Sequence, residues 1–228
     1  MSNSPLVSYT KISPNKTTPR NHKIDTITIH CVVGQLSVET LGRVFSNTAV
    51  KASSNYGIGP DGRIGMYVEE KDRSWCSSNA ANDHRAITIE CASDTKHPYA
   101  VNEKVFKALI ELCADICKRN GIKELKWRGD KNLIGQVDKQ NMTVHRWFAN
   151  KSCPGDYLYN KHTEIKNAVN DILTNSSPQD KKSIDDIAHE VIKGLWGNGQ
   201  DRKDRLIKAG YNYFKVQKKV NEILQKET

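Results

Sequence analysis

The chain has no hydrophobic run long enough to cross a membrane. A transmembrane helix needs about 20 consecutive apolar residues, and no stretch of the 228 residues approaches that length. The segment Met1–Tyr9 also lacks the basic start and the apolar stretch of a secretory signal peptide. We therefore expect a protein that is made in the cytoplasm without a signal peptide and does not insert into a membrane.

Cysteine occurs six times, but never as the CxxC pair of a metal ribbon. Cysteines in a chain without an export signal argue against a disulfide framework. Cys113 and Cys117 lie on one face of an expected helix, so we interpret them as small core residues, and we interpret Cys31, Cys76 and Cys91 in the same way.

No helix-turn-helix, zinc-finger or aromatic RNA-binding signature accompanies the charge of the chain. Lys and Arg number 35 against 26 Asp and Glu, a formal net charge of +9. A basic surface favours polyanionic partners, among them nucleic acid, an anionic membrane and the teichoic-acid-rich wall of a Gram-positive bacterium. Because no nucleic-acid motif is present, we expect no nucleic-acid partner, and the charge alone leaves an anionic membrane surface and the wall as alternatives.

The hydrophobic pattern predicts strands interleaved with helices over residues 1–174. Ile27–Val33 is a β-branched run typical of a buried strand, and Gly59–Gly62 is a turn sequence that predicts a hairpin. Apolar residues at helical spacing follow the capping residue Ser37, and they occur again between Asn102 and Gly121. Both stretches therefore predict helices. This alternation favours an α/β domain with a central mixed β-sheet flanked by helices.

Polar segments separate these elements. Residues 1–22 predict an extended lead-in, and residues 69–85 predict a long loop, which in compact domains is usually functional. Residues 175–182 have the composition of a linker. Residues 183–228 predict a small three-helix domain, whose length is near the lower limit for independent folding.

His145 and Cys153 lie close together in the turn-rich segment Thr143–Asp156. Zn²⁺ prefers imidazole nitrogen and thiolate ligands, so both side chains reach one ion if the chain folds back between them. A third ligand is expected elsewhere, and His30, at the end of the early strand, is the best candidate. A lone histidine is more often a core residue, but three such ligands leave one tetrahedral position for water, as in catalytic zinc sites.

These motifs resemble those of a known family. Thr28–His30, Val144–His145 and Lys151–Asp156 resemble the zinc signature of the type 2 N-acetylmuramoyl-L-alanine amidases, which share a fold with peptidoglycan recognition proteins. Ala86–Cys91 is similar to the central strand of the family. The resemblance implies a zinc-dependent peptidoglycan hydrolase. A non-catalytic receptor of the same fold is the alternative, but such receptors characteristically lack the ligand at Cys153.

The resemblance also implies roles for two charged residues. Glu90 would take a proton from the attacking water and pass it to the leaving amine, and Lys151 would stabilise the oxyanion. A glutamate facing solvent and a solvated loop lysine are the plainer interpretations. Some relatives place a tyrosine near the hairpin strand. The matching position here is Ser54, and Tyr56 lies two residues further on.

Substrate contacts are expected in both domains. Trp75 and Asn82 lie in the long loop, where they either line the peptide groove or pack within a lid. The C-terminal segment resembles one copy of the cell-wall-binding repeat named for the Cpl-7 phage lysozyme. In it, Trp196 and Arg205 are expected to contact glycan, although Trp196 could equally fill the helical core.

The expected setting is that of a phage endolysin acting on a Gram-positive cell wall. Such an enzyme waits in the host cytoplasm and reaches the wall after a partner perforates the membrane, which accounts for the missing signal peptide. A bacterial autolysin is the alternative source. The sequence leaves open the host species, the stem-peptide specificity and the oligomeric state.

Overall fold

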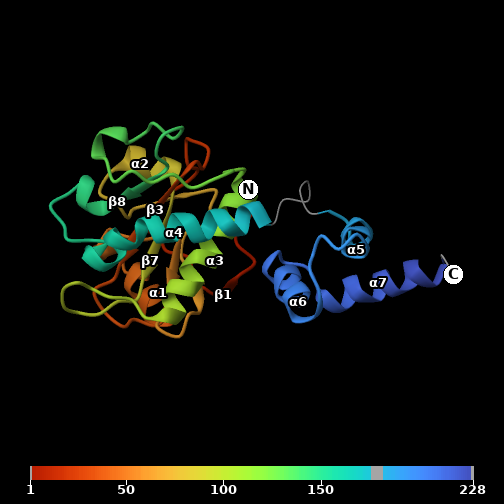
Figure 1. The fold of residues 1–228 in the computed structure, drawn as a ribbon. Coiled ribbons are helices and arrows are strands. Elements are labelled where there is room, and N and C mark those ends of the chain that lie inside the picture. The colour runs from red at the N-terminus through yellow and green to blue at the C-terminus, as the bar shows by residue number, and fades with distance from the viewer. Residues whose placement is uncertain (1, 176–181, 227–228) are drawn as a thin grey trace. The chain divides into compact units, whose positions relative to one another are not determined.

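The structure, a computed structural model, describes residues 2–175 and 182–226. It contains two compact units, Met1–Leu173 and Thr174–Thr228 (Figure 1). Most of the predicted linker, residues 175–182, lies outside the described residues. Among the described helices, none is long and apolar enough to span a membrane.

A six-stranded sheet in the order β1-β5-β4-β7-β3-β8 forms the centre of the first unit (Figure 1). β4 and β5 pair antiparallel, as the predicted hairpin requires, and the other neighbouring strands pair parallel. The sheet is therefore mixed, which confirms the expected fold class. The strands are β1 (Val7–Thr10), β3 (Thr26–Cys31), β4 (Tyr56–Ile58), β5 (Ile64–Met66), β7 (Ala86–Cys91) and β8 (Met142–Val144).

Alternate residues of the central strands β3 and β7 face opposite sides of the sheet. One side is apolar and packs into the main core, with Ile29 of β3 and Ile89 of β7 fully buried. The other side is polar, with Thr28 and His30 beside Thr88 and Glu90 in matching register. The sheet therefore separates a hydrophobic face from a face that carries polar side chains.

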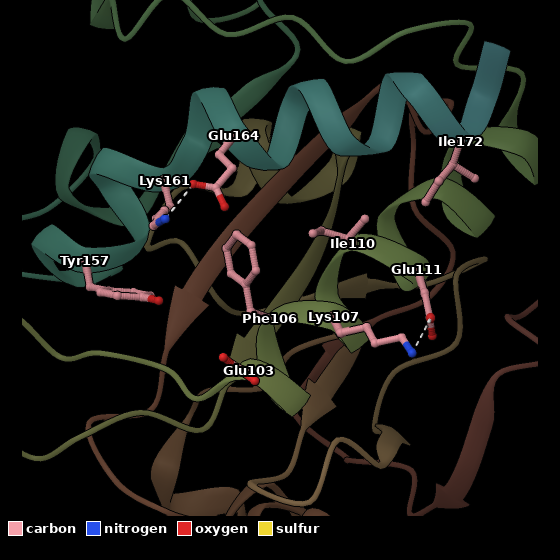
Figure 2. A pocket seen from close by; sticks show the side chains of 9 residues that line it. All are labelled: Glu103, Phe106, Lys107, Ile110, Glu111, Tyr157, Lys161, Glu164 and Ile172. Carbon is pink, nitrogen blue, oxygen red and sulfur yellow. Dashed lines mark hydrogen bonds and ion pairs between the residues drawn. The ribbon is translucent and has the colours of Figure 1, made fainter. Parts of the chain in front are cut away.

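Two long helices, α3 (Glu103–Asn120) and α4 (Gly155–Asn175), supply buried residues to the apolar core and cover that face of the sheet (Figure 1). The predicted limits of α3 are confirmed: the Asn102 side chain accepts from the Val105 N–H, and Gly121 ends the helix with φ +69°. Phe106 and Ile110 of α3 face α4 across a shallow groove. Lys161 and Glu164 form an ion pair on its α4 side (Figure 2).

Ser37 caps α1 (Val38–Ser46) as predicted, but two expectations for irregular segments were wrong. Within residues 1–22, β1 joins the main sheet and β2 (Lys16–Thr17) pairs with β6 (Arg73–Ser74). The predicted loop 69–85 contains β6 and the short helix α2 (Ala80–Arg85). The short strands depend on pairing between distant residues, which leaves little local pattern in the sequence.

The second unit consists of α5 (Ile184–Ile192), α6 (Gly199–Lys208) and α7 (Tyr213–Lys226). Ser183 and Asp186 form a reciprocal capping box at the start of α5. The core of this unit is small and is made of Ile187, Ala188, Val191, Leu206, Val216 and Val220.

Candidate metal centre

Three parallel strands bring the candidate residues to one edge of the sheet. His30 is the last residue but one of β3, and Glu90 lies opposite it on β7. His145 directly follows β8. The carboxyl ends of adjacent parallel strands meet at the same edge, which is where α/β proteins place their sites. The polar face of the sheet therefore ends in a cluster of functional side chains.

His30, His145 and Cys153 converge, with potential ligand atoms all within 4.8 Å of one another. Cys153 Sγ lies 3.3 Å from His30 Nδ1, and the two imidazole rings are 5.2 Å apart. The segment between His145 and Cys153 folds back because the Arg146 N–H donates to the Cys153 carbonyl at 3.0 Å. This is the fold-back that a shared metal ion requires.

The environment keeps both histidines neutral. Burial, with a smaller contribution from nearby His145, lowers the pKa of His30 to about 3. Burial also lowers the pKa of His145, with a smaller contribution from Lys151. Neutral imidazoles offer a free lone pair at neutral pH, so their chemistry, together with one thiol, fits a zinc ion.

The Cys153 thiol resists ionisation without a cation. A hydrogen bond with Cys31, followed by burial, raises its pKa well above the usual range. Metal binding to this group would therefore release a proton.

Glu90 lies beside the three ligands with its carboxylate largely enclosed. Its Oε1 is 4.0 Å from His30 Nδ1, and the side chain is 16% exposed. Oε2 is buried without a hydrogen-bond partner among the described residues. Burial, reinforced by the nearby Cys31, raises the pKa of Glu90 to about 8. A carboxyl group with a pKa near neutrality can both accept and return a proton.

Cys76 was missed by the sequence interpretation as a site residue. Its Sγ lies 3.8 Å from Glu90 Oε1, and with His30 and Glu90 it forms a second group of atoms within 4.8 Å. The sequence predicts a core residue at this position, and the prediction was wrong, because Cys76 lies in the wall of a cavity. Its position beside Trp75 in the polar segment was the only signal in the sequence.

A cavity of about 320 Å³ adjoins the ligand cluster. His145, Lys151 and Trp75 line it, which places the predicted lysine and tryptophan on the open side of the site. Lys51 and Arg73 line it as well, and the sequence interpretation did not single them out.

The structure differs from the expectation for Asn82. This side chain is 5% exposed and does not line the cavity. Its amide donates to Thr28 Oγ1 and Ser77 Oγ, and its carbonyl oxygen accepts from Thr143 Oγ1. Asn82 therefore joins two strands and α2 beneath the site. Asn82 would therefore affect function by positioning these neighbouring segments rather than by contacting substrate.

Tyr56 is also remote from the chemistry. It is fully buried, and its hydroxyl donates to Glu70 Oε1 at 2.7 Å. Ser54 is buried too and donates to the Tyr56 carbonyl. The Tyr56 hydroxyl is therefore not placed to carry a proton at the candidate metal centre.

In the second unit, Trp196 and Arg205 line one cavity of about 480 Å³ together with Leu195. The indole N–H of Trp196 donates to Glu190 Oε2, and its ring packs edge-on against Tyr211. Arg205 pairs with Asp201 and remains mostly exposed. Trp196 thus combines both interpretations, since it packs against the helical core and also presents a wall to the cavity.

Residues 20–156 match the family described as N-acetylmuramoyl-L-alanine amidase. The chain belongs to this family. The candidate ligands and Glu90 all fall within the matched range. A second match, over residues 185–224, is to the CW_7 repeat.

Solved structures share the amidase fold at low sequence identity. "Structure of PlyL" covers 71% of this chain and 95% of that chain, with 14% identity and a TM-score of 0.52. "Mutant endolysin from Bacillus subtilis" covers 71% of this chain and 97% of that chain, with 17% identity and a TM-score of 0.52. "Crystal structure of Se-Met AmpD derivative" covers 74% of this chain and 99% of that chain, with 17% identity and a TM-score of 0.52.

The C-terminal segment has a much closer relative. It is 63% identical over 42 residues to the lysozyme of Streptococcus phage Cp-7. That match covers 18% of this amidase-family chain and 12% of the phage lysozyme, so the likeness is confined to the repeat.

Proposed function

We propose that this chain is a zinc-dependent N-acetylmuramoyl-L-alanine amidase that serves as a phage endolysin. It would cut the amide bond between the lactyl group of N-acetylmuramic acid and L-alanine in the wall of a Gram-positive host. The convergence of His30, His145 and Cys153 beside Glu90 carries this proposal. The cysteine favours an enzyme over a receptor of the same fold.

The three ligands would hold the metal through two imidazole nitrogens and one thiolate. When bound, zinc would act as a Lewis acid that activates water and polarises the amide carbonyl. The fit rests on the neutral histidines and on a thiol within 3.3 Å of His30 Nδ1. Ser77 and Ser78 hydroxyls lie 3.4 Å and 3.0 Å from Nε2 of His30 and His145, where they would help to orient the rings.

Glu90 would carry the proton in both directions. It would first take a proton from the attacking water and then deliver it to the amine of L-alanine as the C–N bond breaks. Burial in the enclosed site raises its pKa, which favours return of the proton to the amine, whereas a zinc ion bound beside it would favour the ionised form that accepts the proton. Lys151, on the open wall of the cavity, would donate to the oxyanion that develops on the substrate carbonyl.

The C-terminal unit would hold the enzyme on its substrate. Residues 185–224 match a repeat also found in a phage lysozyme, and their cavity presents an indole and a guanidinium to a ligand. Aromatic rings and arginine suit the binding of glycan and peptide groups. In this proposal the protein is made in the host cytoplasm and reaches the wall after the membrane is opened.

The decisive experiment is a digest of purified cell walls with and without a chelator. An amidase releases new L-alanine amino termini without new reducing sugars, and it loses activity when zinc is removed. New reducing ends would instead identify a glycosidase. A failure to clear walls under any metal condition would favour the receptor.

A further inference from the structure

The segment Cys76–Ser78, which lies between β6 and α2, contacts three members of the candidate site. Each of its three side chains is within hydrogen-bond distance of a different site residue. The pairs are Cys76 Sγ with Glu90 Oε1 at 3.8 Å, Ser77 Oγ with His30 Nε2 at 3.4 Å, and Ser78 Oγ with His145 Nε2 at 3.0 Å. One short stretch of chain therefore orients the proposed proton carrier and both imidazole rings.

The Cys76 thiol is the donor in its contact with Glu90. Burial, followed by the charge of Glu90, raises the pKa of this thiol well above its usual range, so the thiol keeps its proton. The other carboxylate oxygen of Glu90, Oε2, has no hydrogen-bond partner within the described residues. The thiol therefore supplies a directional contact that orients the Glu90 carboxylate.

The backbone of this segment has a conformation that needs support. Ser78 has φ +58°, in the left-handed region that non-glycine residues rarely adopt. Such a conformation persists only where the surrounding structure offsets its cost, and it is common at functional sites. The contacts that hold the segment therefore determine the geometry of the site.

Asp83, in the first turn of α2, holds the segment through its backbone. Its Oδ2 accepts from the N–H groups of Cys76 and Ser77 at 3.0 Å each, and its Oδ1 accepts from the Ser77 N–H at 3.3 Å. Asp83 is 1% exposed, so water does not compete for these bonds. Its own N–H donates to the Asn79 carbonyl at 3.0 Å, which fixes it on the helix. Hydrogen bonds to a charged acceptor are stronger than neutral ones, so this clamp is firm.

We infer that Asp83 is a positioning residue for the candidate metal centre, because it fixes the segment that orients Glu90 and the two histidines. This inference rests on the proposed zinc amidase function. Asp83 belongs to neither group of candidate ligands among the described residues, so it acts through Cys76 and Ser77 rather than on the metal. Outer partners of metal ligands typically change metal affinity or activity by about 10- to 100-fold.

The test measures zinc affinity and kinetics separately on the full-length chain. Zinc dissociation constants come from competition with a chromophoric chelator, and kcat and KM come from a soluble muropeptide at saturating zinc. Asp83→Ala should weaken zinc binding about tenfold or more and lower kcat by a similar factor. KM should change little, because the Asp83 oxygens are occupied by the backbone rather than by substrate. Asp83→Asn keeps one acceptor oxygen and should restore part of both losses.

Asp25→Ala is the matched control. Asp25 is also buried, at 8% exposed, and accepts from Arg85 of the same short helix, but it lies at the opposite end of β3 from His30. This variant should lower the unfolding temperature without changing zinc affinity. Equal weakening of zinc binding by Asp25→Ala and Asp83→Ala would show that Asp83 only stabilises the fold, which overturns the inference.

A double-mutant cycle with Ser77→Ala shows whether Asp83 acts through the segment. Each single variant should weaken zinc binding, and their combination should weaken it by clearly less than the product of the two factors, because both act on the His30 ring. Full additivity overturns the inference, as does wild-type zinc affinity in Asp83→Ala.

If Asp83→Ala does not fold, Asp83→Asn decides. The loss of one charged acceptor should then weaken zinc binding about threefold, and unchanged affinity contradicts the positioning role. The proposed function is tested separately on the wild type. A wild type that binds zinc but releases no L-alanine termini contradicts only the amidase function, whereas the zinc affinities of the variants still decide the role of Asp83.

Discussion

Each candidate metal ligand comes from a different part of the chain. His30 is the last residue but one of a strand, His145 begins a 3₁₀ turn, and Cys153 precedes the long helix α4. The site therefore depends on the fold of the whole first unit. A metal bound there would in turn link these three segments and raise the stability of the folded state.

Removal of any one ligand should abolish activity and metal binding together. In His30→Ala, His145→Ala and Cys153→Ser, two remaining ligands cannot hold zinc at the affinity of three. Zinc content measured on the purified variants should fall well below one ion per chain in each case. His189→Ala is the control, because its ring bonds to the Asp185 carbonyl in the second unit. A variant that retains full zinc would remove that residue from the ligand set.

Glu90→Gln should separate catalysis from metal binding. Glutamine keeps the size of the side chain but cannot carry the proton, so we expect a rate loss of about 10² or more with zinc retained. Glu111→Gln, on the exposed side of α3, should leave the rate unchanged. Wild-type activity of Glu90→Gln would place the proton carrier elsewhere, and the structure excludes Tyr56 from that role because its hydroxyl is bonded to buried Glu70.

Glu70 is expected to be important for stability rather than activity. Its buried carboxylate accepts from Arg119 at 2.6 Å, from Asn120 at 3.0 Å and from Tyr56 at 2.7 Å. Glu70→Ala leaves these donors without their acceptor and should cost about 3–5 kcal/mol. Urea unfolding measures the loss, and Glu69→Ala, which removes an exposed pair with Lys71, serves as the control. Equal unfolding midpoints for the two variants would contradict this role.

At the scale of elements, α3 shows how two end residues define a helix. Asn102→Ala removes the bond to the Val105 N–H and should destabilise the first unit by about 1 kcal/mol. Gly121→Ala should cost a similar amount, about 1 kcal/mol, because alanine disfavours the left-handed backbone at this position. No steric clash adds to this cost, since no atom lies within 4 Å of an added methyl group. Thermal unfolding would detect both losses, and the exposed Lys107→Ala should change little.

The sequence predicted elements that carry their own periodicity, and it missed those made by distant pairing. α3 was predictable from its apolar stripe and its caps. The central strand that contains His30 was predictable from its β-branched run. The two-residue strands β2 and β6 have no such pattern. The same limit applies to the site. His30, His145 and Cys153 stood out through their motifs, whereas Arg73, Lys51 and Cys76 reach the cavity only through the folded path of the chain.

At the scale of the whole molecule, the two units should be separable. A chain ending at Asn175 retains the sheet, the core and the candidate metal centre, so we expect it to fold and to keep its turnover on soluble muropeptides. On intact walls it should be slower, by up to about 10², because a linked binding module raises the local enzyme concentration.

Pull-down of residues 176–228 with purified walls provides the matched measurement. Trp196→Ala in this isolated unit should weaken retention, since the indole lines its cavity. Circular dichroism must show that the variant keeps its helices, because the same ring packs against a small core. If the isolated unit does not bind and its removal changes nothing on intact cells, it is not a wall anchor.

The register that places His30 opposite Glu90 restricts how this protein can evolve. The spacing between the two side chains is set by the hydrogen-bonded ladder between neighbouring strands, about 4.8 Å wide, rather than by a loop. Gaining or losing a single codon within either strand would turn one of these side chains to the apolar face, although the ladder itself could still form. Descendants of this sequence are therefore free to change loop lengths around the cavity, but the length of these two strands should be inherited unaltered.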